Sequence, residues 1–97
     1  MTAISLSDCT LRWNQEGEVA QCYIVTPTTA DSGDTIDITA LLEDRTVVGV
    51  AGWDTNSSAG GDSVTATYVI STDVITIDAS GSTTDHQYVI RVDLLKI

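Results

Sequence analysis

The segment QYVIRVDLL, Gln87 to Leu95, places a large apolar side chain at every second position. Successive side chains of a β-strand point to opposite faces, so this alternation predicts a strand with one buried face. The residues expected to face the core are Tyr88, Ile90, Val92 and Leu94. The segment favours a β fold because an amphipathic helix would instead repeat its apolar residues every three or four positions.

Similar segments recur upstream, separated by stretches rich in Gly, Ser, Thr, Asn and Asp. The other expected strands are the segment carrying Cys9, Leu11 and Trp13, and the segments Val19–Val25, Thr35–Thr39, Thr46–Trp53, Ser63–Ile70 and Val74–Asp78. About seven short strands at regular spacing predict an all-β fold, a compact antiparallel β-sandwich or small barrel. The length of 97 residues predicts a single β domain over residues 1–97.

The N-terminal segments suggest a hairpin with a bend before it. The apolar phase changes near Ser7 and Asp8, which predicts a bulge or bend. NQEG, Asn14–Gly17, suits a type I turn between two paired strands. Whether Cys9 and Cys22 are bridged stays open, because a one-residue change of register would put them on opposite faces.

The middle of the chain contains further local signals. Ile36 and Ile38 should face inward, and ALLEDR, Ala40–Arg45, has room for one short helical turn. TVVGVAGW, Thr46–Trp53, is an apolar run typical of a central strand covered on both faces. Gly49 and Gly52 within this run indicate a bulge or a close backbone approach.

In the next hairpin, the side chains of Val64, Ala66, Tyr68 and Ile70 are expected to share one face of the strand. The turn STD then leads directly into Val74–Asp78.

The net charge of the chain restricts the kinds of molecule that it is expected to bind. The formal net charge is −10, from 14 acidic and 4 basic residues. Binding to nucleic acid or to an anionic membrane depends on clusters of Lys and Arg, so both are disfavoured. No segment approaches the roughly 20 apolar residues of a membrane span. The segment MTAISLSD lacks both the basic start and the apolar run of a secretory signal, so the chain is expected to fold in the cytoplasm of the cell that makes it.

No segment predicts catalysis or cofactor binding. His86 follows Asp85 and lies near Ser82, but three residues of one loop rarely converge as a catalytic triad. DTNSSAGGD, Asp54–Asp62, lacks the Gly and Glu of a calcium-binding EF-hand loop. DSGD, Asp31–Asp34, carries carboxylates and no following Lys, so it is not a phosphate-binding loop. We therefore expect no catalytic residue, no cofactor and no metal, and no enzymatic activity.

Trp53 ends the apolar strand and directly precedes a polar loop. Two interpretations are open. Trp53 either fills the end of a core that has no Phe, or it is a partly exposed anchor, since Trp and Tyr are enriched at interaction sites. With Trp13 and Tyr23 it forms the set of candidate interface residues.

The ordered series VTPTTADSGDTIDIT, VVGVAGWD, VTATYVI and VITIDASGSTTDHQYVI resembles small virion proteins of tailed bacteriophages, over about Ile24 to Val92. Shared features are a Thr-rich strand entry, a "V.GV.GW" strand, a short "TIT" hairpin and a terminal "YV..V" strand. The resemblance implies a non-enzymatic virion structural protein, most simply a capsid decoration (cement) protein.

Such a protein would lie on the capsid exterior, bound as a homotrimer to the major capsid protein at local threefold positions. It would fold in the host cytoplasm and bind neither nucleic acid nor membrane. Two alternatives are a tail or head-fibre component of the virion and a stand-alone extracellular glycan-binding β-module.

Overall fold

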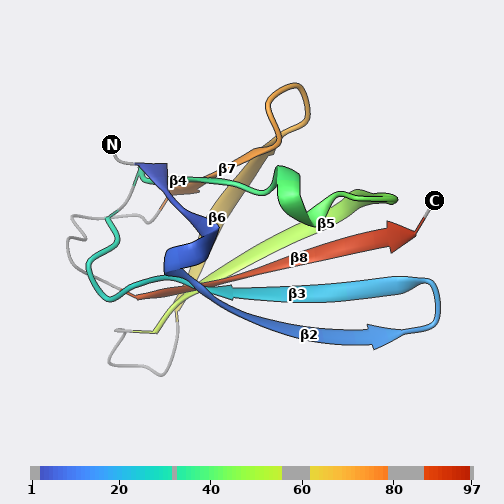
Figure 1. Ribbon diagram of the computed structural model, residues 1–97. Helices are drawn as coiled ribbons and strands as arrows, with labels where there is room; N and C mark the ends of the chain where they lie inside the picture. Colours follow the sequence, from blue (N-terminus) through green and yellow to red (C-terminus); the bar gives the residue numbers. More distant parts are fainter. Residues whose placement is uncertain (1–2, 32, 56–61, 79–86, 97) are drawn as a thin grey trace.

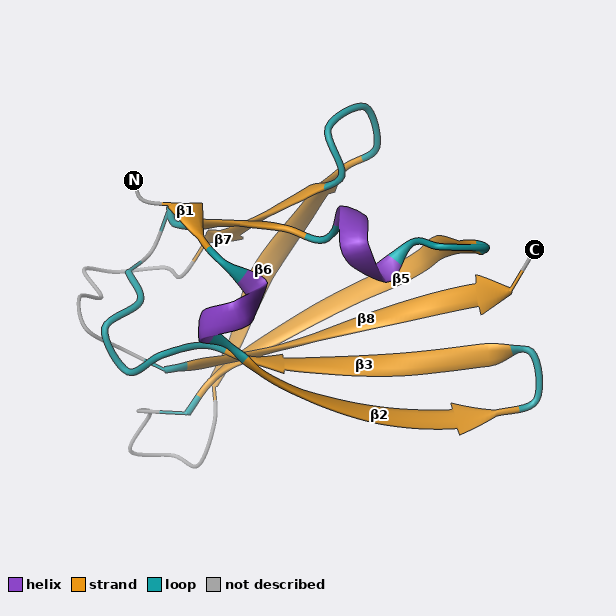
Figure 2. Ribbon diagram, viewed as in Figure 1, coloured by secondary structure: helices purple, strands orange, loops and turns teal. Residues whose placement is uncertain are grey.

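The computed structural model describes residues 3–31, 33–55, 62–78 and 87–96. Their eight strands follow one another in the hydrogen-bonded order β1-β4-β7-β6-β5-β8-β3-β2. The strands are β1 (Ala3–Ile4), β2 (Thr10–Glu16), β3 (Val19–Val25), β4 (Thr35–Asp37), β5 (Arg45–Asp54), β6 (Asp62–Val69), β7 (Val74–Asp78) and β8 (Tyr88–Lys96). In this part of the chain the helical segments are two single 3-10 turns, η1 (Leu6–Asp8) and η2 (Thr39–Leu41), drawn in purple in Figure 2.

The strands form two layers joined by β6. We call β1-β4-β7-β6 the short sheet and β5-β8-β3-β2 the long sheet. Residues 62–64 of β6 pair with β5, whereas residues 65–69 pair with β7, so β6 passes from one layer to the other. Figure 1 shows β6 crossing steeply between the long strands and the projecting β6–β7 hairpin. All neighbouring strands are antiparallel except β1 and β4.

The predicted all-β class is confirmed, and the arrangement is that of a small sandwich. The two strands at the ends of the order, β1 and β2, have no pairing with each other among the described residues. A barrel would require that pairing to close the sheet.

The core lies between the two sheets, on what we call the inner face of each. The side chains with no exposed surface come from β3, β4, β7 and β8 and from the residue after β4: Cys22, Ile24, Ile36, Ile38, Ile75, Ile77, Tyr88, Ile90, Val92 and Leu94. The predicted phase of Tyr88 to Leu94 is therefore confirmed, as is the inward position of Ile36 and Ile38.

The β2–β3 hairpin turns later than predicted. Asn14 is not the first residue of a turn but lies within β2, where it pairs with Gln21. Glu16 pairs with Val19, so the turn consists of the two residues Gly17 and Glu18. Gly17 has a φ of 66°, and the first central position of a type II′ turn requires this left-handed conformation. The expected type I turn over Asn14–Gly17 is thus wrong, because a two-residue type II′ turn matches the strand twist better.

Both predicted irregularities near the sheet ends are confirmed. The change of phase near Ser7 and Asp8 corresponds to η1, whose single turn bends the chain between β1 and β2. The short helical turn expected within Ala40–Arg45 is η2, which begins at Thr39.

The apolar run at the start of β5 is only half covered. β5 lies between β6 and β8, but its outward side chains have no second layer over them among the described residues, so the expectation of cover on both faces is wrong. The predicted bulge is present, because the β5–β8 register shifts between Val47 and Gly49. Val48, which has no partner in this register, is 56% exposed.

The β6–β7 hairpin also departs from one expectation. Ala66 and Tyr68 pack against the core as predicted. Ile70, however, lies beyond the end of β6 and is 80% exposed. Alternation stops applying where the strand ends, so Ile70 does not continue the inward row.

Candidate functional site: the outer face of the long sheet

The long sheet has a second face, which points away from the core and which we call the outer face. Its central row is formed in register by Tyr23 of β3, Arg91 of β8 and Ala51 of β5. The next row joins Val25, Val89 and Trp53 in the same order of strands. These side chains are half-buried, although the inner-face residues between them are completely buried. Alternation therefore produces an open surface with an aromatic residue on each side of one arginine.

Arg91 is the centre of this surface. Its guanidinium carbon lies 5.7 Å from the centroid of the Trp53 ring, within the range of a cation–π interaction. Arg91 Nε also lies 3.2 Å from Asp93 Oδ1, an ion pair without the geometry of a hydrogen bond. The two side chains are 31% and 20% exposed. Arg91 is thus held in place by neighbours on both sides and still reaches solvent.

Tyr23 completes the cluster. It lies opposite Arg91 on one side and opposite Arg12 of β2 on the other. Its hydroxyl donates to Gln21 Oε1 at 3.4 Å. We name the set Tyr23, Trp53, Arg12 and Arg91 the outer-face cluster.

Gly49 shapes the neighbouring part of this surface. A Cβ atom at Gly49 would lie 2.8 Å from Asp93 Oδ2, which is closer than side chains tolerate. The missing side chain therefore lets the Asp93 carboxylate lie across β5 while it pairs with Arg91. This close approach agrees with the prediction made for the glycines of the strand.

The candidate interface residues are only partly brought together. Trp53 and Tyr23 share the outer face, and Trp53 is not part of the buried core, so the core-filling interpretation of Trp53 is wrong. Trp13 lies opposite Cys22, on the inner face of β2. It is nevertheless 45% exposed, and the Arg45 guanidinium carbon lies 5.0 Å from its ring centroid.

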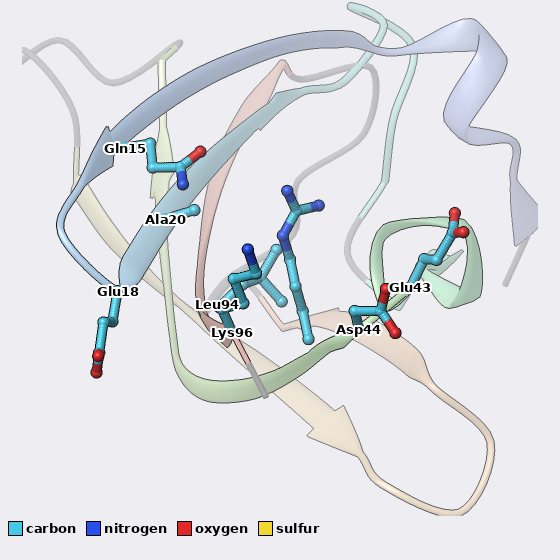
Figure 3. Close-up of a pocket in the computed structure, with 8 residues that line it drawn as sticks. Gln15, Glu18, Ala20, Glu43, Asp44, Leu94 and Lys96 are labelled. Carbon is cyan, nitrogen blue, oxygen red and sulfur yellow. The ribbon is translucent and has the colours of Figure 1, made fainter.

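A depression of about 160 Å³ lies at this end of the inner face. Figure 3 shows Gln15, Ala20, Leu94 and Lys96 on its sides, with Glu43 and Asp44 across from them. Arg45 and Lys96 supply its positive charges, and Glu18, Glu43 and Asp44 supply its negative charges. The charges of both signs lie next to each other at the surface, an arrangement typical of a solvated rim.

The two cysteines do not supply reactive chemistry. Both thiols are free. Cys22 lies opposite Trp13, four residues along the strand direction from Cys9, which corresponds to about 13 Å and exceeds the reach of a disulfide. Burial raises the pKa of the Cys22 thiol to about 11, and burial together with Asp8 raises the pKa of Cys9. Neither group is therefore a thiolate nucleophile at neutral pH.

The remaining candidates from the sequence are the loop that contains His86, the loop after Asp54 and the segment DSGD. Ser82, Asp85 and His86 lie outside the described residues, as does most of the loop after Asp54. In the segment DSGD, Asp34 Oδ2 accepts a hydrogen bond of 2.8 Å from the Asp31 backbone amide. The described residues contain no group of three or more His, Cys, Asp or Glu side chains placed to hold a metal ion.

The charges are distributed unequally between the two layers. The four basic residues, Arg12, Arg45, Arg91 and Lys96, all lie on strands of the long sheet. The described part of the short sheet and its connections carries only acidic charged residues: Asp8, Asp31, Asp34, Asp37, Glu43, Asp44, Asp62, Asp73 and Asp78. Trp53 and Tyr23 could be recognised in the sequence as candidate interface residues, whereas Arg12 and Arg91 were not among these candidates. The sequence signal that could have identified them is alternation: each arginine lies between inward-facing apolar residues of its strand, which places it on the outer face.

The sequence matches no family model, and the comparisons with curated proteins and with solved structures found no similar protein. Among the described residues, no helix has the length and apolar character needed to cross a membrane.

Proposed function

We propose that the chain is a non-enzymatic structural protein of a tailed-bacteriophage virion, which decorates the capsid by binding the major capsid protein. The observation that carries the proposal is the outer-face cluster, in which Tyr23, Arg91 and Trp53 are fixed on an uncovered sheet face. Tyr, Trp and Arg are the residues most enriched at the energetic centres of protein interfaces. The sequence resemblance suggests the major capsid protein as the partner, and the outer-face cluster is the surface proposed to contact it.

The rigidity of the cluster supports a docking role. Its side chains project from four neighbouring strands of one sheet, so their spacing is fixed by backbone hydrogen bonds. Arg91 is already positioned by Trp53 and Asp93. A preorganised surface loses less conformational entropy on binding than flexible loops do.

The charge distribution supports an orientation. With the outer face against a capsid subunit, Arg12 and Arg91 would lie in the contact and the acidic short sheet would face solvent. Like charges on neighbouring exteriors would then repel further copies, which favours a single decorating layer. In this proposal three copies surround each local threefold position.

The test is cosedimentation of the purified protein with emptied capsids made of the major capsid protein encoded in the same genome. Saturable binding is expected for the unmodified chain, with a loss of about tenfold or more in affinity for Arg91→Ala or Trp53→Ala. The matched control is Ile70→Ala, which removes a more exposed apolar side chain located away from the outer face.

Three results would contradict the proposal. The first is a folded protein that does not bind these capsids, and the second is a genome that encodes no capsid protein. The third is binding that is weakened as much by Ile70→Ala as by Arg91→Ala. Binding to purified tails or to glycans instead of capsids would support the alternative classes.

A further inference from the structure

The two ends of the strand order differ in how well they are protected from pairing with another chain. The strand β1 at one end has only two residues. The strand β2 at the other end has seven, and it pairs with β3 in an unbroken register without a bulge. It contains neither Pro nor Lys, two residues that natural proteins use to block strand edges. Among the described strands only β3 pairs with β2, so its second edge is free.

The hairpin register identifies the free backbone groups of this edge. Glu16 and Val19 close a two-residue turn, and such a closing pair exchanges both backbone hydrogen bonds. Every second residue of β2 counted back from Glu16 therefore bonds to β3. The residues between them, Leu11, Trp13 and Gln15, direct their N–H and C=O groups away from β3 toward the free edge.

We propose that β2 pairs antiparallel with β2 of a second copy of the same chain, with Trp13 opposite Trp13 of that copy. The pairing would join two long sheets into one continuous eight-stranded sheet across a two-fold axis. It requires no other component, so it is independent of the proposed role in a virion.

The charge of β2 favours a second copy of the chain as its partner. The chain as a whole carries a net charge of −10, which disfavours random contacts between copies. The sequence of β2 contains one Arg and one Glu and is therefore neutral overall. This strand is thus a place where two copies can approach without strong repulsion, and an edge meeting its own copy has matching length and twist.

The register of the proposed β2–β2 pairing follows from the backbone groups of β2 that do not bond to β3. With the axis at Trp13, Leu11 lies opposite Gln15 of the second copy, and all seven residues overlap. The three residues with free backbone groups then all find partners. An axis at Arg12 would place two guanidinium groups opposite each other, and an axis at Asn14 would place Leu11 opposite the turn residue Gly17.

The exposure of Trp13 fits the same register. Its ring is 45% exposed although it lies on the inner face, and Trp13 is not among the residues that pack against the buried core, whereas Leu11 is. Arg45 covers part of the ring at 5.0 Å. Two such rings meeting at the axis would form a cross-strand aromatic pair, which is among the more favourable pairs in antiparallel sheets.

The first test measures the mass of the protein in solution by light scattering across a concentration series. Gln15→Pro removes a free-edge N–H that β3 does not use, so the hairpin is retained while the edge is blocked. The matched variant Gln15→Thr keeps this N–H. The unmodified chain and Gln15→Thr are expected to have twice the mass of Gln15→Pro, with all three folded by circular dichroism.

Equal masses for the three folded proteins would overturn the proposal, whether they are monomers or oligomers of another kind. Should Gln15→Pro fail to fold, Trp13→Ala with its backbone intact serves in its place, with the same expected halving of mass at the lower concentrations.

The second test checks the register by disulfide formation in a Cys9→Ser background. Arg12 and Asn14 of the second copy would form a non-hydrogen-bonded pair with Cα atoms about 4.5 Å apart, within the range of a disulfide. A mixture of the Arg12→Cys and Asn14→Cys variants is expected to cross-link on oxidation, and each variant alone is not. Cross-linking of either variant alone would overturn the Trp13-centred register, and an unlinked mixture would overturn the pairing.

Discussion

The two faces of the long sheet are built from the same strands but have opposite characters. In β8, Ile90 and Val92 have no exposed surface, whereas Arg91 between them reaches solvent at the centre of the outer face. In β3, Cys22 and Ile24 are buried, whereas Tyr23 between them lies on the open side. The inner face supplies the folding free energy through buried area, and the outer face presents a rigid pattern of aromatic and cationic groups. Sequence alternation therefore gives single strands one buried apolar face and one open face that carries aromatic and cationic side chains.

The largest expected effect is a loss of stability from a substitution on the inner face. Ile90→Ala should reduce the free energy of unfolding by about 2–5 kcal/mol, since it leaves a cavity beside Ile24 and Gly52, its cross-strand neighbours. Val89→Ala, one residue away on the outer face, should cost less than about 1 kcal/mol. Urea unfolding of both variants measures the contrast, and equal losses would show that the outer face is also structural.

A smaller effect on stability is expected from Trp53→Ala. The loss of the cation–π contact with Arg91 and of part of the packed ring should cost about 1–2 kcal/mol, more than any loop substitution. The same variant should lose capsid binding. Thermal unfolding and cosedimentation measure the two effects, and a variant silent in both would contradict the role given to Trp53.

Gly49→Ala should cost about 1 kcal/mol, because the added Cβ would displace the Asp93 carboxylate from β5. Asp93→Ala removes the obstructing oxygen, so the double variant should be less destabilised than the sum of the two single variants. Urea unfolding of the four proteins gives the coupling free energy. Additive losses of stability would show that the absence of a side chain at Gly49 does not determine where the Asp93 carboxylate lies.

The smallest effect concerns Tyr68, which packs against the core while its hydroxyl donates to Asp73 Oδ1 at 2.7 Å. Burial and this hydrogen bond raise the pKa of Tyr68 to about 12, above the value of about 10 in an unfolded chain. The folded state thus favours the protonated phenol, and this stabilisation is present below about pH 10 and lost as the pH rises toward 12.

Tyr68→Phe should therefore be less stable than the unmodified protein by about 1 kcal/mol at pH 8, with a difference that shrinks above pH 10. Urea unfolding as a function of pH measures it. Asp73→Asn serves as a control that retains the ring but changes its partner. A difference that stays constant up to pH 12 would contradict the raised pKa.

Much of the fold could be predicted from the sequence. The bounds expected for Val19–Val25 and Val74–Asp78 agree with β3 and β7, and the inward phase of β8 is confirmed. Periodicity succeeds in these strands because each has one buried face. It fails at Ile70, which lies past the end of its strand, and at Asn14, where the turn type determines the position of the loop.

The candidate site was less predictable. Alternation showed that Trp53 and Tyr23 belong to strands, but strand order decides which of them become neighbours. The sequence gives no local sign that β8 lies between β3 and β5, which is what brings Arg91 between the two aromatic residues. Trp13 was a candidate interface residue in the sequence, but its 45% exposure on the inner face could not be predicted, because alternation does not show where along β2 the core ends.

The central position of β8 also has a consequence for biosynthesis. Among the described strands the β2–β3 hairpin meets β5 only through β8, which follows all of them in the sequence. A nascent chain that lacks residues 88–96 therefore has two unjoined halves of the long sheet, and the layer can close only after this segment leaves the ribosome. Contacts between strands so distant in sequence form slowly. Newly made molecules therefore pass through a stage in which the edges of β3 and β5 that later pair with β8 have no partner.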